Sequence, residues 1–262
     1  MKILKMLMVL VFPLSAFAAP QFTGINEADM KEITKGMGAN FVHNSMLGAS
    51  KMGTVFGFQL GVVAAQTDTP ELHKLAKETG GELKNLYNAG LMGAVGIPFG
   101  IAFEATVMPT AKSDDASARG SSFALKWNIN DVIPILPVNL AIRGVSSNAE
   151  FSFNQTVGAQ TAKVKNTTAV TGVQLLFSPM IPLIEPYIGV GTLSAKNKLE
   201  WKGSAGTIFD PAYTTGTEKS ETVSGTQILA GIDVNLLLLK IGLEYSKAFD
   251  NSRVGFKLGI GF

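Results

Sequence analysis

The chain has 262 residues, a formal net charge of +2 and no cysteine. The lack of cysteine excludes disulfide scaffolds, zinc–thiolate sites and thiol catalysis. The net charge is small and no basic cluster stands out, so nucleic acid is not an expected partner. Charged residues make up 16% of the chain, against about 25% in ordinary soluble domains, and the mean hydropathy is +0.25. This composition favours a protein that contacts lipid.

The first 18 residues have the three parts of a secretory signal peptide. Met1–Lys5 is positively charged, Met6–Leu14 is apolar, and the Ala-Phe-Ala motif at 16–18 matches the small-x-small pattern of a cleavage site. The apolar run is too short for a membrane helix, which needs about 20 residues. We therefore expect secretion through the Sec pathway and a mature chain that begins at Ala19.

Residues 19–53 are predicted to form an N-terminal segment with its own helix. Asn26 is a suitable N-cap for a helix that ends near Phe41, with acidic residues in its first turn and glycines near its end. Met30 and Ile33 give this helix a small apolar face. The Gly-, Ser-, Asn- and Met-rich stretch that follows, up to residue 53, is predicted to be irregular.

From residue 54 onward, apolar residues alternate with small or polar ones, the period of two that is typical of strands. About ten segments have the length of barrel strands, and a charged amphipathic helix is predicted among them at 70–87. The region 143–173 fits either one long hairpin or strands with bulges. The segments lie around residues 56–62, 91–97, 99–107, 122–129, 138–153, 173–177, 188–190, 228–236, 241–246 and 254–262.

The two faces of these segments indicate where lipid lies. One face carries large apolar residues, and the other is mostly Gly, Ala, Ser and Asn. A soluble barrel needs a well-charged outer face, so lipid contact is favoured over a secreted soluble barrel. Without a membrane helix, only a closed barrel hides backbone polar groups from lipid. The sequence predicts an all-β, transmembrane, antiparallel up-and-down β-barrel over residues 54–262, with about 10 strands (roughly 8–12).

Short and long connections alternate along the barrel region. The short ones lie near 98–100, 131–137, 178–186 and 236–240, and the long ones near 66–88, 109–120, 154–161 and 196–222. This alternation is typical of outer-membrane proteins, with tight periplasmic turns, long external loops and both termini on the periplasmic side. Aromatic residues at strand ends are expected to form interfacial girdles, namely Trp127, Tyr187, Trp201 and Tyr245.

The C-terminus carries a motif with a known counterpart. Phe256, Leu258, Ile260 and Phe262 occupy every second position up to the last residue. This ending resembles the assembly signal of bacterial outer-membrane barrels, which commonly finish on Phe. The resemblance implies recognition by the barrel-assembly machinery and insertion into the outer membrane of a Gram-negative-type bacterium.

A short helix, a Gly/Asn-rich stretch and then a first strand form a layout similar to that of long-chain fatty-acid transporter-like barrels, and to that of uncharacterised exported barrels of comparable length. In those transporters an N-terminal segment plugs the lumen. The resemblance implies a plug that includes Met30, Ile33, Phe41 and His43, and a hydrophobic substrate. This chain is shorter than those transporters and lacks their Asn-Pro-Ala motif.

No enzyme signature is found. His43 precedes Ser45 by two residues, a spacing at which an imidazole can orient a serine nucleophile. The arrangement resembles the His-x-Ser pair of lipid-A-trimming barrels. No acidic partner is assigned to it, so we expect a plug or packing role for His43, and solvent exposure for His73. No metal site and no cofactor are expected.

Seven polar residues fall on the predicted inward face of the strands. A barrel of about ten strands holds side chains or one narrow passage. These groups either neutralise one another in a structural network, because unpaired buried charge is costly, or line a path for a ligand. They are Gln59, Glu104, Lys126, Arg143, Asp233, Glu244 and Lys257.

The expected function is passive, non-enzymatic transport or binding of a small molecule, hydrophobic ones included, with the helix at 26–41 gating the lumen. The alternative is a structural or surface-interaction barrel that acts through its external loops. A minor third alternative is an outer-membrane lipid hydrolase that depends on His43. The expected partners are outer-membrane lipid, the barrel-assembly machinery and a small hydrophobic ligand.

Overall fold

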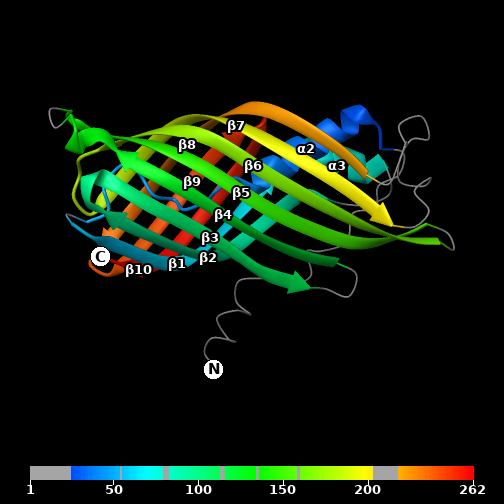
Figure 1. Ribbon diagram of the computed structural model, residues 1–262, viewed down its shortest axis with the longest axis horizontal. Coiled ribbons are helices and arrows are strands. Elements are labelled where there is room, and N and C mark those ends of the chain that lie inside the picture. Colours follow the sequence, from blue (N-terminus) through cyan, green and yellow to red (C-terminus); the bar gives the residue numbers. More distant parts are fainter. Residues whose placement is uncertain are drawn as a thin grey trace, which may run out of the picture.

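The computed structural model describes residues 25–53, 55–78, 83–112, 116–133, 136–157, 160–202 and 218–262. In these residues ten antiparallel strands form a closed barrel, in which each strand pairs with its neighbours in sequence and β1 pairs with β10 (Figure 1). The predicted transmembrane up-and-down barrel is thereby confirmed. The predicted signal peptide, residues 1–18, lies outside the described residues.

The strands fall into two groups by length. Six have 10 to 13 residues, close to the ~9–11 that cross the hydrocarbon region at a tilt: β1 (Gly57–Asp68), β2 (Asn85–Ile97), β3 (Ile101–Lys112), β4 (Ala116–Asn128), β9 (Leu239–Ala248) and β10 (Asn251–Gly261). Four have 19 or 20: β5 (Val138–Val157), β6 (Gln160–Pro179), β7 (Ile184–Lys202) and β8 (Glu218–Leu236). These four strands extend past the others at one end of the barrel.

Strands β5 and β6 settle the uncertain region 143–173. Their register runs without a shift from Val138 paired with Pro179 to Val157 paired with Gln160. The region is therefore part of one long hairpin. In β7 and β8 the same extension places Glu218 opposite Glu200, whereas β9 pairs with β8 only from Gln227 onward.

The outer surface is apolar and the inner surface is small or polar, as predicted. Leu91, Phe103 and Phe123 point outward with 54–59% of their surface exposed. Their inward neighbours Ala102 and Ala124 are buried. In a soluble protein the large apolar residues are buried, whereas here the small residues are buried and the large apolar ones face out. This arrangement suits a barrel whose exterior contacts lipid.

The expected aromatic girdle is only partly correct. Trp127 and Tyr245 are 40% and 50% exposed on the outer surface. Tyr187 and Trp201 are 2% and 3% exposed and face the lumen, so the prediction is wrong for them. Their positions in the alternation of β7 place both on the inward face, and strand-end location alone does not reveal this.

The first and last strands close the barrel at Phe58 and Phe262. Each residue's backbone N–H donates to the carbonyl of the other, at 2.9 and 3.0 Å. Their rings meet edge to face with centroids 4.5 Å apart. A Cβ at Gly261 would collide with the Phe58 carbonyl, so glycine permits the close approach of β1 and β10 at this seam.

In the described ranges two α-helices accompany the strands. Helix α2 (Glu27–Phe41) begins with a capping box between Asn26 and Asp29, as the sequence indicated. Helix α3 (Pro70–Glu78) is shorter than the predicted 70–87. Residues 85–87 instead pair with Gln66 to Asp68 and extend the β1–β2 ladder, which overrides their helical pattern. No helix in the described ranges is long and apolar enough to cross a membrane. Two short 3₁₀ turns, η2 (Pro98–Gly100) and η3 (Ile129–Asp131), connect strands.

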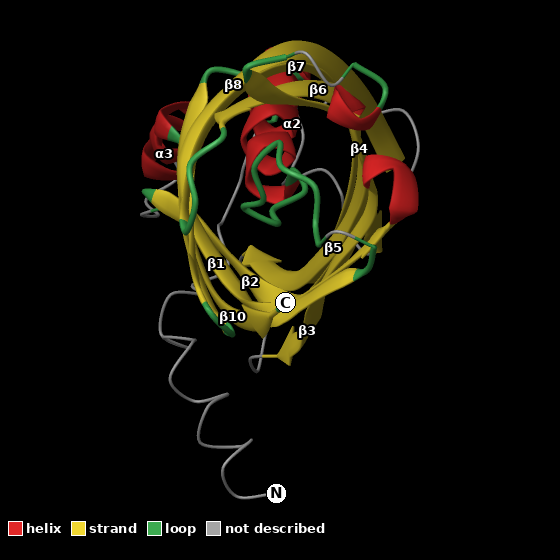
Figure 2. Ribbon diagram, turned by 90° about the vertical axis from the view of Figure 1, so that its left-hand side faces the viewer, coloured by secondary structure: helices red, strands yellow, loops and turns green. Residues whose placement is uncertain are grey.

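Helix α2 lies inside the barrel, against the inner faces of β6, β7 and β8 (Figure 2). Its start packs in an apolar cluster with Phe153, Leu199 and Trp201. Its end packs in a second cluster with Val170, Ala195 and Phe249. At Gly38 an added Cβ would lie 2.7 Å from the Ala195 Cβ, so this glycine lets the helix approach the wall closely.

The beginning of α2 and the end of β10 lie at opposite ends of the barrel. Ile25 packs against Leu199 and Trp201, which precede the long 203–217 connection. Phe262 pairs with Phe58, at the end where the strands are joined by short turns. The expectation that both termini lie on the periplasmic side concerns, for the N-terminus, residues outside the described ranges. Residue 25 itself lies at the opening opposite the short turns. The segment crosses the lumen once before β1 starts, so its beginning must lie at the other opening.

This orientation predicts a labelling pattern. We expect Glu27→Cys, at an exposed site near the start of α2, to react with a membrane-impermeant maleimide on intact cells. The chain has no native cysteine. Leu237→Cys, 91% exposed in the turn between β8 and β9, should react only after the outer membrane is permeabilised. The reverse pattern would contradict the orientation.

Candidate functional site

The segment between α2 and β1 fills the lumen next to the helix (Figure 2). We call residues 42–50 the lumen segment. Its residues from Val42 to Ala49 are buried, and its backbone is neither helix nor strand. Buried peptide groups need hydrogen-bond partners, and an irregular backbone cannot supply them itself. The barrel wall therefore has to provide them.

Four buried cationic side chains of the wall donate to carbonyl groups of the lumen segment. Lys and Arg carry only donors, so each of them needs an acceptor when it is buried. The pairs are Arg253 to Val42 O (2.9 Å), Lys257 to Met46 O (2.8 Å), Arg143 to Leu47 O (3.3 Å), and Lys126 to Gly48 O (2.8 Å) and Ser50 O (3.0 Å).

Neutral and acidic side chains complete the set of contacts at the far end of the lumen segment. The Ala49 backbone N–H donates to Ser178 Oγ at 2.8 Å, and its carbonyl accepts from Asn128 at 2.7 Å. The Ser50 N–H donates to Glu185 at 2.8 Å. A Cβ at Gly48 would overlap the Glu185 carboxylate. The segment is thus fixed by the wall residue by residue.

Some of the buried charges are also paired with one another. Lys257 forms an ion pair with Asp233 at 2.9 Å, and Arg143 lies 3.6 Å from Glu104. Glu244 accepts a hydrogen bond from the Tyr187 hydroxyl at 2.9 Å. Pairing and hydrogen bonding are what make burial of ionised groups tolerable.

The seven inward residues expected from the sequence are all buried in the lumen. The structure brings Glu104, Lys126 and Arg143 together around the lumen segment, and Asp233 and Lys257 into a pair close to Met46. Glu244 lies apart from these and contacts Tyr187. Gln59 is buried, and its amide nitrogen has no hydrogen-bond partner among the described residues.

The residues expected to plug the lumen lie in or next to it. Met30, Ile33 and His43 are buried, and Phe41 is half-buried. Sequence reasoning missed Arg253, although the inward alternation of Lys257 and Gly255 extends back to it. It also missed Asn128 and Glu185, whose contacts depend on the path of the lumen segment, and Gln174, which bonds to Arg143 and Gln227 of the wall.

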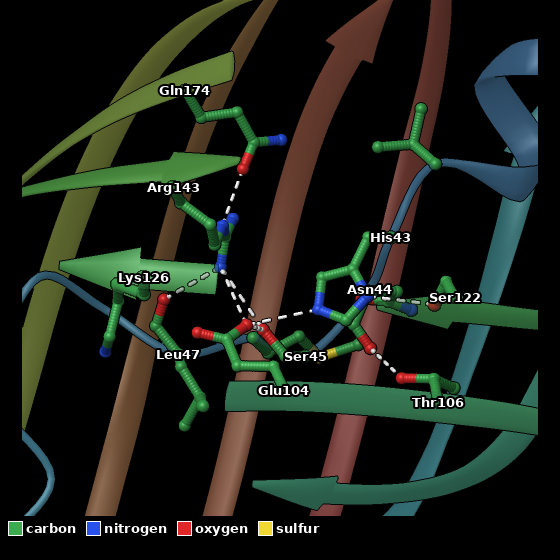
Figure 3. Close-up of polar contacts among 12 residues, drawn as sticks. His43, Asn44, Ser45, Leu47, Glu104, Thr106, Ser122, Lys126, Arg143 and Gln174 are labelled. Carbon is green, nitrogen blue, oxygen red and sulfur yellow. Dashed lines mark hydrogen bonds and ion pairs between the residues drawn. The ribbon is translucent and has the colours of Figure 1, made fainter. Parts of the chain in front are cut away.

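His43 lies at the centre of a buried cluster (Figure 3). Its Nδ1 is 2.8 Å from Ser122 Oγ, and its Nε2 is 3.1 Å from Glu104 Oε2. Ser45 donates to the same carboxylate oxygen at 2.5 Å. The acidic partner that the sequence did not reveal is therefore Glu104, and the serine that contacts the imidazole is Ser122 rather than Ser45.

A partly open cavity lies beside this cluster, between the lumen segment and strands β1 to β5. Phe41, Val42 and Asn44 line it on the inner side. The wall side includes Ser122 and Ser147, with further contributions from Val63, Asn88, Thr106, Met108, Gly120, Ser121 and Asn148. Within the described ranges no group of three or more His, Asp or Glu residues is arranged to hold a metal ion.

Comparison with solved structures finds barrels with low sequence identity. The translocator domain of the autotransporter NalP from Neisseria meningitidis has 15% identity and a TM-score of 0.45, over 90% of this chain and 95% of that one. The outer-membrane protease OmpT from Escherichia coli has 10% identity and a TM-score of 0.41, over 79% of this chain and 96% of that one. Ail, the attachment invasion locus protein of Yersinia pestis, has 12% identity and a TM-score of 0.35, over 79% of this chain and 97% of that one.

No curated protein matches the chain. Residues 3–260 match the family described as "Family of unknown function (DUF6588)". The match covers nearly the whole chain, and the protein belongs to this family.

Proposed function

We propose that this protein is an outer-membrane barrel whose lumen segment gates the passive passage or binding of a small molecule. The observation that carries the proposal is the polar wall behind the segment. Four buried cations donate to backbone carbonyls of residues 42–50. A barrel that needed only a filled core would be served by apolar side chains, which cost less to bury. Without the segment, this wall would bind water.

The contacts that hold the lumen segment are hydrogen bonds that can be exchanged for hydrogen bonds to water. A hydrogen bond between protein groups replaces one to water, so its net contribution is about 0.5–1.5 kcal/mol, or roughly 1.5–3 kcal/mol when one group is charged. When the segment moves, water can form hydrogen bonds with both the wall cations and the segment's carbonyl groups. The wall contacts backbone carbonyls rather than particular side chains, so shifted positions can also be satisfied.

The charge balance of the lumen indicates what could pass. Among the described residues, the buried cations Lys126, Arg143, Arg253 and Lys257 are matched by the buried acids Glu104, Glu185, Asp233 and Glu244. A passage with equal numbers of both signs has no strong preference for either ion type. At the outer end the path is bordered by the apolar cluster around Met30 and Trp201. A small uncharged molecule, including a hydrophobic one, fits both features.

A second function is supported by the extended strands. Strands β5 to β8 rise beyond the other six at the outer end of the barrel. Ion pairs lie at this end of the barrel, with Glu150 3.0 Å from both Arg119 and Lys165, and Lys198 2.7 Å from Glu218. A protruding charged surface is suited to contact with a molecule outside the cell.

The route to the membrane is part of the proposal. Residues 1–18 would direct export through the Sec pathway. The last strand would then serve as the signal for the barrel-assembly machinery. Phe256, Leu258, Ile260 and Phe262 all point outward and are 42–66% exposed, which leaves them accessible for such recognition. Lipid of the outer membrane would contact the same outward face.

A reversible crosslink tests the gate. Asn139 Nδ2 lies 2.9 Å from Ser50 Oγ, so the double variant Ser50→Cys/Asn139→Cys should form a disulfide between lumen segment and wall. In planar bilayers we expect rare openings when this variant is oxidised, and more frequent openings after reduction. Deletion of residues 25–50 should give a constantly open barrel. Equal conductance in all three states would contradict gating by the segment.

A single substitution tests the cationic contacts. Lys126→Met removes the donor to two buried carbonyls and keeps a similar volume, and an unpaired buried polar group costs about 1–3 kcal/mol. We expect more frequent openings in bilayer recordings than with the unmodified protein. Lys240→Met, on the half-buried edge of β9, is the matched control and should behave like the unmodified protein. An unchanged opening frequency in Lys126→Met would argue against these contacts as the closing interaction.

A further inference from the structure

We propose that Ser122, His43 and Glu104 form a nucleophilic relay, and that it hydrolyses a small ester that enters between the lumen segment and the wall, where a partly open cavity borders Ser122. This activity goes beyond gating. The inference rests on the contacts of His43, on the cavity that borders Ser122 and on an unpaired hydroxyl in the same cavity.

The two hydrogen bonds of His43 define its tautomer. Glu104 is a carboxylate that also accepts a hydrogen bond from Ser45 and lies near Arg143. It therefore accepts a hydrogen bond from the imidazole as well. The Nε2 atom, 3.1 Å from Glu104, therefore carries the hydrogen. The Nδ1 atom is then a free acceptor, and Ser122 Oγ donates to it at 2.8 Å. This is the arrangement in which an imidazole can take a proton from a serine.

The fold holds the three groups from independent elements. Glu104 and Thr106 lie on the same inward face of β3, and Thr106 is the register partner of Ser122 on β4. His43 comes from the lumen segment. The residues on either side of it are anchored, since Val42 O accepts from Arg253 and Asn44 O accepts from Thr106. The imidazole is thus positioned between fixed backbone points.

The cavity is partly open and borders Ser122. It is lined by apolar groups from Phe41, Val42 and Met108, and by polar groups that include Ser122 and Ser147. Ser147 is the register partner of Ser122 on β5, so their Cβ atoms lie roughly 4.5–5.5 Å apart. Its hydroxyl is buried and has no hydrogen-bond partner among the residues that the structure describes. A donor at this place can stabilise negative charge on a carbonyl oxygen attacked by Ser122.

The reaction balances with water as the second reactant. Ser122 Oγ attacks the ester carbonyl carbon, and its proton passes to His43 Nδ1. The bond between the carbonyl carbon and the alcohol oxygen breaks, and the imidazolium returns the proton to the departing alcohol. Water then attacks the acyl-serine and gives a proton to His43. That proton returns to Ser122 as the carboxylic acid leaves.

The same contacts also stabilise the fold, but stability alone does not account for the cavity. A structural His–Glu pair needs neither a serine at a cavity wall nor a second, unpaired hydroxyl opposite it. Leaving a buried hydroxyl without a partner costs about 1–3 kcal/mol. A bound substrate or water would satisfy it.

A fluorophosphonate probe tests the relay in the folded, detergent-solubilised protein. We expect one covalent adduct on Ser122, located by peptide mass spectrometry, and hydrolysis of p-nitrophenyl butyrate. Ser122→Ala should lose both. His43→Asn should slow labelling about 100-fold or more, the usual contribution of a general base. Ser246→Ala, another buried inward serine, should keep both activities. Heat-dependent gel mobility reports whether each variant is folded.

Glu104 acts through His43 and is a positioning residue. In Glu104→Gln the imidazolium loses the carboxylate that favours it, so the pH midpoint of labelling should move to a lower value. A purely structural role would leave that midpoint unchanged. The proposal is overturned if the folded protein gives no adduct on Ser122, or if p-nitrophenyl butyrate hydrolysis persists in Ser122→Ala. Equal labelling rates in folded His43→Asn and unmodified protein would also overturn it.

Discussion

The structure depends on the pairing of wall cations with carbonyl groups of the lumen segment. Inside a membrane barrel, polar groups need hydrogen-bond partners from the protein or from water in the lumen. Buried Lys and Arg have donors and no acceptors, and an irregular segment has carbonyls without intramolecular donors. Each of Lys126, Arg143, Arg253 and Lys257 donates to at least one carbonyl of residues 42–50.

The small residues of the wall follow from the same constraint. A Cβ at Gly255 would lie 2.5 Å from Met46 Cε, and one at Gly242 would lie 3.2 Å from Met46 Cβ. The lumen segment therefore occupies the space that the small residues on the inner face of the last two strands leave free. The outer face of the same strands carries large apolar residues. One alternating pattern thus serves lipid contact outside and segment packing inside.

The two proposed activities are linked through His43. The imidazole reaches Ser122 and Glu104 only while the lumen segment is seated, because it is carried by that segment. Displacing the segment would open the passage and separate the base from the serine. A closed state that holds a substrate and an open state that releases molecules are then two positions of one element.

Local patterns in the sequence determined the barrel, the outward apolar face, the N-cap of α2 and the inward position of seven polar residues, because each depends on a period of two or on neighbours a few residues apart. Only the tertiary structure decided that residues 85–87 join β2, that Tyr187 and Trp201 face the lumen, and that α2 begins at the opening opposite the short turns. It also brought Glu104 and Ser122 to His43 across 61 and 79 residues. These contacts depend on strand register and on the path of the lumen segment, and a local sequence pattern predicts neither of them.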